Sequence, residues 1–377
     1  MNARPRYRIL IATHAPLSPE YGAAQSAISL AETLRRNGHD VVLWSPALPA
    51  STPWWRGRSL MRRQLARFIV ENGPFDLVDA PPLLLPVMAN RAAVSVARSV
   101  QPPVRYLLIE LFSARLRRPS DAIRWLLMAV MTLWQLPVVL GDWLRARHVL
   151  VLGELEHEWM KRWLPFLADK MSIYRPTLAQ AERVRLAAIR GRRSAWTGPG
   201  VKFLWIGRWA AHKGIDRLTD FLNTRFAVAP ADMLTIAGCG KLPEGAIAAD
   251  LLRRGHVRVV AAFSRDELYG LLESHDAGLF TSHAEGWGFS LNEMIEAGLP
   301  VFATSAGAVP DLRRACPACL QPFPPPPAPD INGLRARMKL GDPYDALINW
   351  NGVVALYERL IEDDRKISAR PRPPLRL

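Results

Sequence analysis

The sequence contains only three cysteines among its 377 residues: Cys239, Cys316 and Cys319. Three cysteines are too few for a disulfide framework, and the Cys316/Cys319 pair lacks the second pair or the nearby histidines that would complete a zinc site. This low cysteine usage is typical of proteins in a reducing cytosol.

Targeting and nucleic-acid-binding patterns are also missing. The start of the chain, MNARPRYRILIATHAP, reaches a strand-like apolar run without the long apolar region and small-residue cleavage site of a signal peptide. We therefore expect a cytoplasmic protein. The sequence has no zinc-finger, RNP-type or basic-zipper pattern, which argues against a nucleic-acid partner.

Acidic residues are outnumbered, 34 against 49 lysines and arginines, so the formal net charge is +15. This balance favours anionic partners such as phosphates, nucleotides or an acidic membrane leaflet, without choosing among them. With 49% hydrophobic residues and 377 residues in all, the chain is long enough to fill two hydrophobic cores.

Apolar runs of strand length alternate with helical periodicity along most of the chain, which predicts parallel sheets covered by helices. In the first half, strands are predicted at 7–13, 40–45, 75–80, 104–110 and 148–153. A basic, turn-rich stretch at 183–200 precedes a second series of strands at 201–207, 233–238, 257–263, 277–282 and 300–305. Ser264 and Glu267 have capping-box spacing at the start of one helix between them.

We predict two Rossmann-like, doubly wound α/β domains, 1–182 and 183–348, that face an interdomain cleft. A helix at about 349–364 follows and is expected to pack back on the first domain. The basic end of the chain, 365–377, is predicted to be disordered.

Ligands of open α/β sheets bind in the loops beyond the carboxyl ends of the strands. In the loop IGRWAAHKG, Arg208 and Lys213 directly follow a predicted strand and have the chemistry to hold a diphosphate. A pair of solvated surface charges explains them equally well.

The stretch EGWGFSLNE, 285–293, holds two glutamates. Gly286 and Gly288 allow close backbone approach, and the amides around Phe289 and Ser290 form a helix N-terminus that suits an anion. Glu285 precedes the helix and is able to accept hydrogen bonds from ligand hydroxyls. Glu293 has an alternative, because Ser290 and Glu293 also have the spacing of a capping box. A third loop, PLSPEYGAAQS, brings Gly22 and Ala23 to the start of the first helix but lacks the full dinucleotide fingerprint.

These loops together resemble the retaining glycosyltransferases of the GT-B fold, specifically the sugar-nucleotide-dependent family 4. The resemblance is strong from Val201 to Leu312, where FLWIGRWAAHKGIDRL, LTIAGCG and EGWGFSLNEMIEAGLPVFATSAGAVPDL match the family's motifs, the last being its E-x7-E motif. It implies a metal-independent hexosyltransferase with no cofactor besides the nucleotide-sugar donor, in agreement with the lack of an acidic metal-holding cluster in the sequence.

The resemblance also implies roles for single residues. Arg208 and Lys213 would contact the donor diphosphate, Glu285 the sugar hydroxyls and Glu293 the ribose. The donor-binding set implied as a whole is Gly22, Ala23, Gly207, Gly238, Gly286, Gly288, Phe289, Ser290 and Glu293. The first half matches more loosely: the family often places a histidine after a middle strand, and the corresponding stretch VRYLLIELFSA has Glu110 instead, which is either an active-site residue or a buried structural acid.

We predict transfer to a glycan or a lipid-linked acceptor in cell-surface polysaccharide or glycoconjugate biosynthesis, and the sequence leaves the identity of the acceptor open. The segment STPWWRGRSLMRRQLARFIV, 51–70, has the tryptophan and arginine content of an interfacial helix on anionic lipid, which would make the protein peripheral on the inner face of the plasma membrane. A solvated, partly core-covering helix is the alternative. The apolar run 125–141 is at the lower limit for a span, and we predict a buried helix. A sugar-nucleotide epimerase and a catalytically silent nucleotide-binding scaffold are the competing functions.

Overall fold

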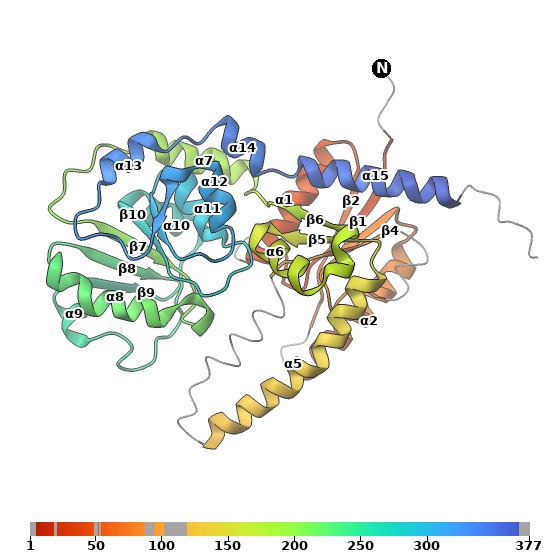
Figure 1. Ribbon diagram of the computed structural model, residues 1–377, viewed down its shortest axis with the longest axis horizontal. Helices are drawn as coiled ribbons and strands as arrows, with labels where there is room; N and C mark the ends of the chain where they lie inside the picture. The colour runs from red at the N-terminus through yellow and green to blue at the C-terminus, as the bar shows by residue number, and fades with distance from the viewer. Residues whose placement is uncertain are drawn as a thin grey trace, which may run out of the picture.

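A computed structural model describes residues 5–18, 21–48, 52, 54–86, 94–101 and 119–368. Within these residues the chain forms two parallel six-stranded sheets, each covered by helices. Figure 1 shows the two sheets as separate bodies side by side, the first on the right and the second on the left. The predicted fold class, two doubly wound α/β domains, is confirmed.

The first sheet has the strand order β2-β1-β3-β4-β5-β6, with every neighbouring pair parallel. Its strands are short apolar runs that are buried on both faces, as expected for a sheet between two helix layers. The strands are β1 Arg8–Ala12, β2 Asp40–Trp44, β3 Leu77–Ala80, β4 Val94–Arg98, β5 His148–Leu152 and β6 Met171–Tyr174, and the helices are α1 Gly22–Arg36, α2 Trp54–Asn72, α5 Pro119–Arg145 and α6 Gly153–Trp163.

The second sheet has the order β12-β11-β10-β7-β8-β9. Its strands are β7 Lys202–Ile206, β8 Met233–Ala237, β9 Val257–Val260, β10 Ala277–Phe280, β11 Val301–Ala303 and β12 Leu320–Pro322. Its helices are α7 Gln180–Gly191, α8 Ile215–Val228, α9 Ala249–Arg253, α10 Arg265–Ser274, α11 Phe289–Glu296, α12 Val309–Ala315, α13 Ile331–Arg337 and α14 Asp342–Leu347, and short 3₁₀ helices lie at Pro165–Lys170, Ala211–Lys213 and Pro317–Cys319. The five strands predicted for this half all form.

The last helix, α15 Asn351–Ser368, returns to the first sheet, and Figure 1 shows it lying above that sheet. The Tyr357 hydroxyl donates a hydrogen bond to the buried carboxylate of Asp79 on β3. Trp350 Nε1 donates to Ser29 Oγ on α1 at 3.0 Å. The chain therefore forms the first sheet, then the second sheet, and its last helix packs on the first sheet again.

The prediction of the middle strands of the first half needs correction. The predicted strand 104–110 lies outside the described residues and stays a prediction. β4 forms at Val94–Arg98, where no strand was predicted. Two polar residues obscured that strand. Ser95 is buried, and Arg98 is fully buried because Asp79 accepts two hydrogen bonds from its Nε at 3.0 and 2.8 Å.

The apolar run 125–141 does form a helix, but the prediction that it is buried is wrong for most of its length. α5 projects away from the first sheet in Figure 1, and Leu133 and Trp134 are 70% and 55% exposed. The end near the sheet is packed, because Val139 and Trp143 are buried. Among the described residues, no helix is long and apolar enough to cross a membrane.

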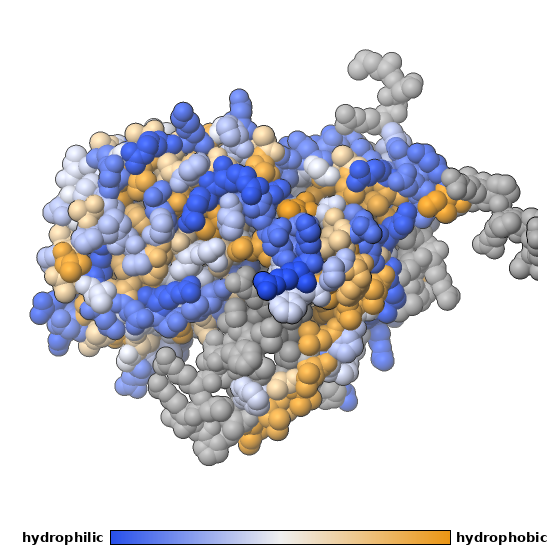
Figure 2. Space-filling view, viewed as in Figure 1, coloured by the Kyte–Doolittle hydropathy of each residue, from blue (hydrophilic) through white to orange (hydrophobic). Residues whose placement is uncertain are grey.

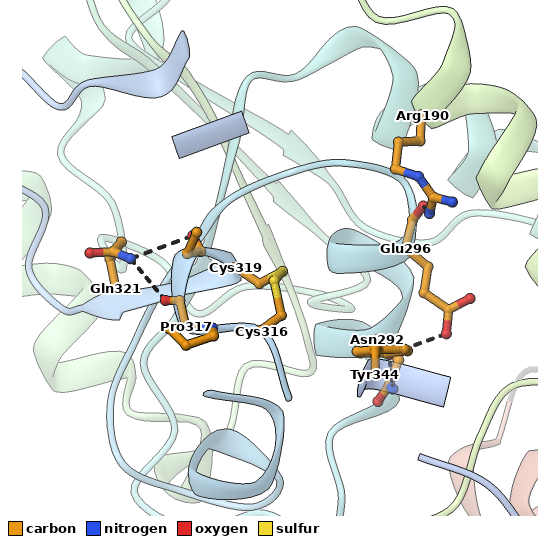
Figure 3. Close-up of a disulfide and its surroundings, with 9 residues drawn as sticks. Arg190, Asn292, Glu296, Cys316, Pro317, Cys319, Gln321 and Tyr344 are labelled. Carbon is orange, nitrogen blue, oxygen red and sulfur yellow. Dashed lines mark hydrogen bonds between the residues drawn. A yellow bond between two sulfur atoms is a disulfide. The ribbon is translucent and has the colours of Figure 1, made fainter. Parts of the chain in front are cut away.

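The three cysteines end in two different states. Cys316 and Cys319 are joined by a disulfide beside the 3₁₀ helix Pro317–Cys319, as Figure 3 shows. The sequence analysis did not anticipate this bond between residues three positions apart. Cys239 is a buried free cysteine after β8.

Candidate active site

The two predicted donor loops meet where the second sheet reverses its strand order. β7 lies between β8 and β10, so the chain runs outward from β7 to β9 and then returns to the other side of β7. In doubly wound sheets, ligands bind at such a switch point, beyond the carboxyl ends of the strands. The loop 207–214 follows β7 and the loop 281–288 follows β10, so both loops reach this place.

Backbone contacts fix the two loops against each other. Thr281 Oγ1 donates to the carbonyl oxygen of Lys213 at 2.8 Å, and the His283 N–H donates to that of His212 at 2.8 Å. Gly214 has a φ of 67°, and a Cβ there would lie 1.9 Å from the carbonyl oxygen of Thr281. Only glycine tolerates both the left-handed conformation and this approach, so Lys213 is held at a defined position beside the second loop.

Lys213 and Glu285 form an ion pair at the centre of this arrangement. Lys213 Nζ donates to Glu285 Oε1 at 2.9 Å and to Oε2 at 2.7 Å, and Ser282 Oγ donates to Oε2 at 3.1 Å. The two charged side chains are only 14% and 12% exposed, so each charge offsets the desolvation of the other. Arg208, at the end of β7, is exposed.

Glycines set the path of the loop between Glu285 and α11. Gly288 has a φ of 85°, and a Cβ there would come within 3.1 Å of Glu285 Cγ. A Cβ on Gly286 would lie 2.5 Å from the carbonyl oxygen of Val100, which belongs to the first half of the chain. The loop therefore packs closely both on its own glutamate and across to the other domain.

Two helix N-termini converge on this loop, one from each half. A Cβ on Gly22, the first residue of α1, would touch the ring of Phe289, the first residue of α11, at 3.4 Å. The N-cap residues Tyr21 and Gly288 make no side-chain capping bond. The first-turn amides, including those of Ala23 and Ser290, thus lie at helix ends that carry partial positive charge and suit an anion.

Glu293 does not cap its own helix. α11 begins at Phe289 with Gly288 as its N-cap, which leaves Ser290 inside the helix, so the predicted capping box with Ser290 is wrong. Glu293 is instead buried, and its Oε1 accepts hydrogen bonds from Arg265 Nη1 at 2.7 Å and from Gln25 Nε2, on α1, at 3.5 Å. Burial raises the pKa of Glu293, while the Arg265 guanidinium opposes that rise. The capping box predicted at Ser264 and Glu267 is confirmed.

A polar network holds the far end of α11, as Figure 3 shows. Asn292 Oδ1 accepts from Trp287 Nε1 at 2.7 Å, and its Nδ2 donates to the Tyr344 hydroxyl at 2.8 Å. That hydroxyl donates to Glu296 Oε1 at 3.2 Å. Arg190 Nη1 donates to the carbonyl oxygen of Glu296 at 2.6 Å. The helix that carries Phe289, Ser290 and Glu293 is therefore rigidly supported.

The other predicted donor-loop glycines lie on neighbouring strand ends. Gly207 follows β7, and its N–H donates to the carbonyl oxygen of Ala237 at 3.0 Å. Gly238 follows β8 with a φ of 71°, and a Cβ there would lie 3.0 Å from Phe263 Cε1. At both positions a Cβ would press on neighbouring side chains, Trp205 and Lys213 beside Gly207 and Phe263 beside Gly238.

The first half contributes a buried carboxyl group near the contact between the domains. Glu156, on α6, accepts hydrogen bonds from Ser99 Oγ at 2.5 Å and from the Leu152 N–H at 2.7 Å, and burial raises its pKa to about 7. Next to it, a Cβ on Gly153 would lie 2.7 Å from Asp311 Oδ2 of the second half. Glu110, the predicted active-site residue of this half, lies outside the described residues.

Sequence reasoning missed the partners that position the glutamates. Arg265 and Gln25 were not singled out, since they reach Glu293 through the tertiary fold. Ser282 was not singled out either, although it lies only three residues before Glu285. At Arg265 a local signal was present, because this residue follows the capping serine and so had to project from the first turn of α10. In the described ranges no cluster of three or more His, Cys, Asp or Glu side chains has the arrangement of a metal site.

Comparison with known proteins agrees with this geometry. Residues 192–315 match the family model described as "Glycosyl transferases group 1", a stretch that contains both donor loops. No protein among the curated sequences matches the chain.

The fold is found in several solved glycosyltransferase structures. Sucrose-phosphate synthase from Thermosynechococcus elongatus is 15% identical, with a TM-score of 0.60 over 96% of this chain and 100% of that one. The catalytic domain of Starch Synthase IV from Arabidopsis thaliana, bound to ADP and acarbose, is 12% identical, with a TM-score of 0.60 over 96% and 99% of the two chains. WaaG, a glycosyltransferase involved in lipopolysaccharide biosynthesis, is 16% identical, with a TM-score of 0.54 over 95% of both chains. At these identities the likeness shows the fold alone.

Proposed function

We propose that the chain is a retaining glycosyltransferase of the family whose model, "Glycosyl transferases group 1", matches residues 192–315, and that it uses a nucleotide-sugar donor. From this premise we propose that it transfers a hexosyl group to a glycan or a lipid-linked acceptor in the synthesis of a cell-surface polysaccharide or glycoconjugate. The observation that carries the proposal is the Lys213–Glu285 pair at the switch point of the second sheet, beside two helix N-termini without side-chain caps.

The donor diphosphate binds between these positive groups. Arg208 offers a planar fork of N–H donors and Lys213 a point charge, and the first-turn amides of α1 and α11 add partial positive charge. Because the Lys213 ammonium has three N–H donors, it can keep one on Glu285 while another reaches a phosphate oxygen. The Starch Synthase IV structure with bound ADP supports a nucleoside diphosphate as the ligand of this fold.

The two glutamates hold opposite ends of the donor. Glu285 accepts hydrogen bonds from the sugar hydroxyls, and Lys213 and Ser282 keep its carboxylate oriented for that purpose. Glu293 binds the ribose, and Arg265 holds its carboxylate in place and opposes the rise in its pKa that burial causes. The second half, 183–348, thus serves the donor, and the first half, 1–182, serves the acceptor.

Catalysis then depends on the leaving group. As the bond from sugar to diphosphate breaks, negative charge grows on the diphosphate and positive charge on the sugar ring. Donors that are fixed before the reaction stabilise the departing charge, each by about 2–4 kcal/mol if an oxyanion-hole donor is a fair guide.

Incubation of the full-length protein with a panel of sugar nucleotides tests this function. A transferase releases nucleoside diphosphate from its own donor, an epimerase changes the sugar without that release, and a silent scaffold does neither. Arg208→Ala and Lys213→Ala should each lower the release by two orders of magnitude or more. Lys202→Ala is the matched control, because Lys202 is exposed at the opposite end of the same strand. Normal release by both loop variants would remove the diphosphate assignment.

A further inference from the structure

One face of α5 presents large apolar side chains to solvent. Ile123, Leu126, Leu127, Val130, Leu133 and Trp134 are 50–70% exposed. Their positions follow the i, i+3, i+4, i+7 spacing of one helix face, so they form a continuous stripe, which we call the α5 stripe. From residue 123 to residue 134 it runs about 17 Å at 1.5 Å per residue. Figure 2 shows a band of hydrophobic residues along the projecting helix.

The protein fixes this helix at its base. Arg62 of α2 forms two hydrogen bonds with the buried Asp142 carboxylate, at 3.1 and 2.9 Å, and Arg145 pairs with the same group at 2.5 Å. The Leu83 N–H donates to Asp142 at 2.9 Å. Val139 and Trp143 are buried against the first sheet. The α5 stripe is therefore held in a set orientation on an element that leaves the body of the domain (Figure 1).

Charge distinguishes between two partners that could cover the α5 stripe, a lipid surface and a second copy of the chain. From 122 to 141 the sequence has no acidic residue, and Arg124 is its one charged residue. The neighbouring α2 exposes Arg56 and Arg63, and the whole chain carries +15. A second copy would bring the same positive charge and be repelled, whereas an anionic lipid surface attracts it. A projecting apolar element with a tryptophan also matches what enters the interface of a lipid layer.

We propose that α5 docks the protein on an anionic lipid surface by burying the α5 stripe in one leaflet. The docking needs no donor and no transfer step, so it goes beyond the proposed function. It involves the projecting half of α5, with the arginines of α2 at the lipid surface. If the acceptor is lipid-linked, docking also brings the first half of the chain to the acceptor. This consequence rests on the proposed function.

Vesicle flotation with the full-length protein tests the proposal. We compare vesicles of phosphatidylcholine alone with vesicles that also contain phosphatidylglycerol. The wild type should float with the anionic vesicles, and added salt should weaken but not abolish that binding. The double variant Leu126→Glu/Leu133→Glu should lower partitioning at least about tenfold. The control Val228→Glu/Leu252→Glu replaces exposed apolar residues on α8 and α9 and should float like the wild type.

A second measurement separates the lipid surface from a second copy. In Leu133→Cys the new thiol is exposed, while Cys239 is buried and Cys316 and Cys319 are paired, so one polarity-sensitive dye attaches at the stripe. Its emission should shift to the blue with anionic vesicles, and the dye on Val228→Cys should not respond. Equal flotation of the stripe and control variants would overturn the proposal. Light scattering measures the oligomeric state of the same proteins. If the wild type and the control variant are dimers and the stripe variant is a monomer, the stripe binds a second copy of the chain and the proposal is wrong. Donor turnover without lipid reports on the proposed function separately.

Discussion

At the scale of single residues, the site depends on charges that compensate each other in a dry place. Lys213 and Glu285 are each mostly buried, and each charge lowers the cost of burying the other. Glu293 of α11 and Arg265 of α10 form a second such pair, with side chains 6% and 20% exposed. The site therefore holds both carboxylates in fixed orientations and largely shields them from bulk water.

Glu156 predicts a pH dependence of stability. Its pKa is raised to about 7 in the folded protein, against 4.5 for an ordinary glutamate. Between these values the unfolded chain releases the proton and the folded chain keeps it, so this group's contribution is fully present below pH 4.5 and is lost as the pH rises to 7. Glu156→Gln keeps an acceptor for the Leu152 N–H and a donor for Ser99 Oγ, and should remove this loss.

Urea unfolding of Glu156→Gln and the wild type at several pH values checks this prediction. The variant should gain stability relative to the wild type as the pH rises from 4.5 to 7, by about 1–3 kcal/mol in total. Parallel stability curves for the two proteins over that range would contradict the assigned pKa.

At the scale of elements, the junction between the β7 and β10 loops is the most constrained feature of the site. Gly214→Ala would place a Cβ 1.9 Å from the Thr281 carbonyl oxygen, in addition to the strain of a φ of 67°. Gly240→Ala has a similar φ of 70° but meets nothing within 4 Å. The control should cost about 1–2 kcal/mol from backbone strain alone, and Gly214→Ala should cost clearly more.

Denaturant unfolding together with donor turnover measures the difference between the two glycine variants. We expect Gly214→Ala to lose turnover, because Lys213 moves away from Glu285, while Gly240→Ala keeps it. Similar stabilities and similar turnover for the two variants would show that the close approach at Thr281 does not shape the site.

The elements also show what the sequence predicted and why some predictions failed. Strands β7, β8, β9, β10 and β11 are apolar runs between clear breakers, so their pattern predicts them directly. Strand β4 was not predicted because it contains Arg98, whose burial depends on its ion pair with Asp79. No local sequence pattern reveals that contact. The exposed α5 was expected to be buried because of its apolar content. Apolar content predicts that a helix face needs a partner, but it does not identify that partner.

At the scale of the whole molecule, α15 ties the end of the chain to the first domain. Tyr357 donates a hydrogen bond to Asp79, which is buried and also pairs with Arg98. Tyr357→Phe removes one donor from a buried carboxylate and should lower the free energy of unfolding by about 1.5–3 kcal/mol. Tyr269→Phe on α10 is the matched control and should cost less. Equal unfolding midpoints for both variants in denaturant would contradict the role given to Tyr357.

The loops of the site were predictable, but their assembly was not. A switch point gathers the carboxyl ends of β7 and β10, so the sequence identified Arg208, Lys213 and Glu285 from their positions after strands. The approach of Gly22 to Phe289 and of Gln25 to Glu293 depends on how the two domains meet. Local patterns contain no such information, which is why Glu293 was also given a capping role that the structure excludes.

The central claim, that Glu285 holds the donor sugar at this site, is tested most directly by the turnover of the donor in Glu285→Gln. The substitution keeps the size of the side chain and a carbonyl acceptor for Lys213 and Ser282, so the melting temperature should stay close to that of the wild type. Release of nucleoside diphosphate should fall about 100-fold or more. The control Glu273→Gln changes an exposed ion pair with Arg192 and should leave turnover unchanged. Full turnover by a correctly folded Glu285→Gln would contradict the account.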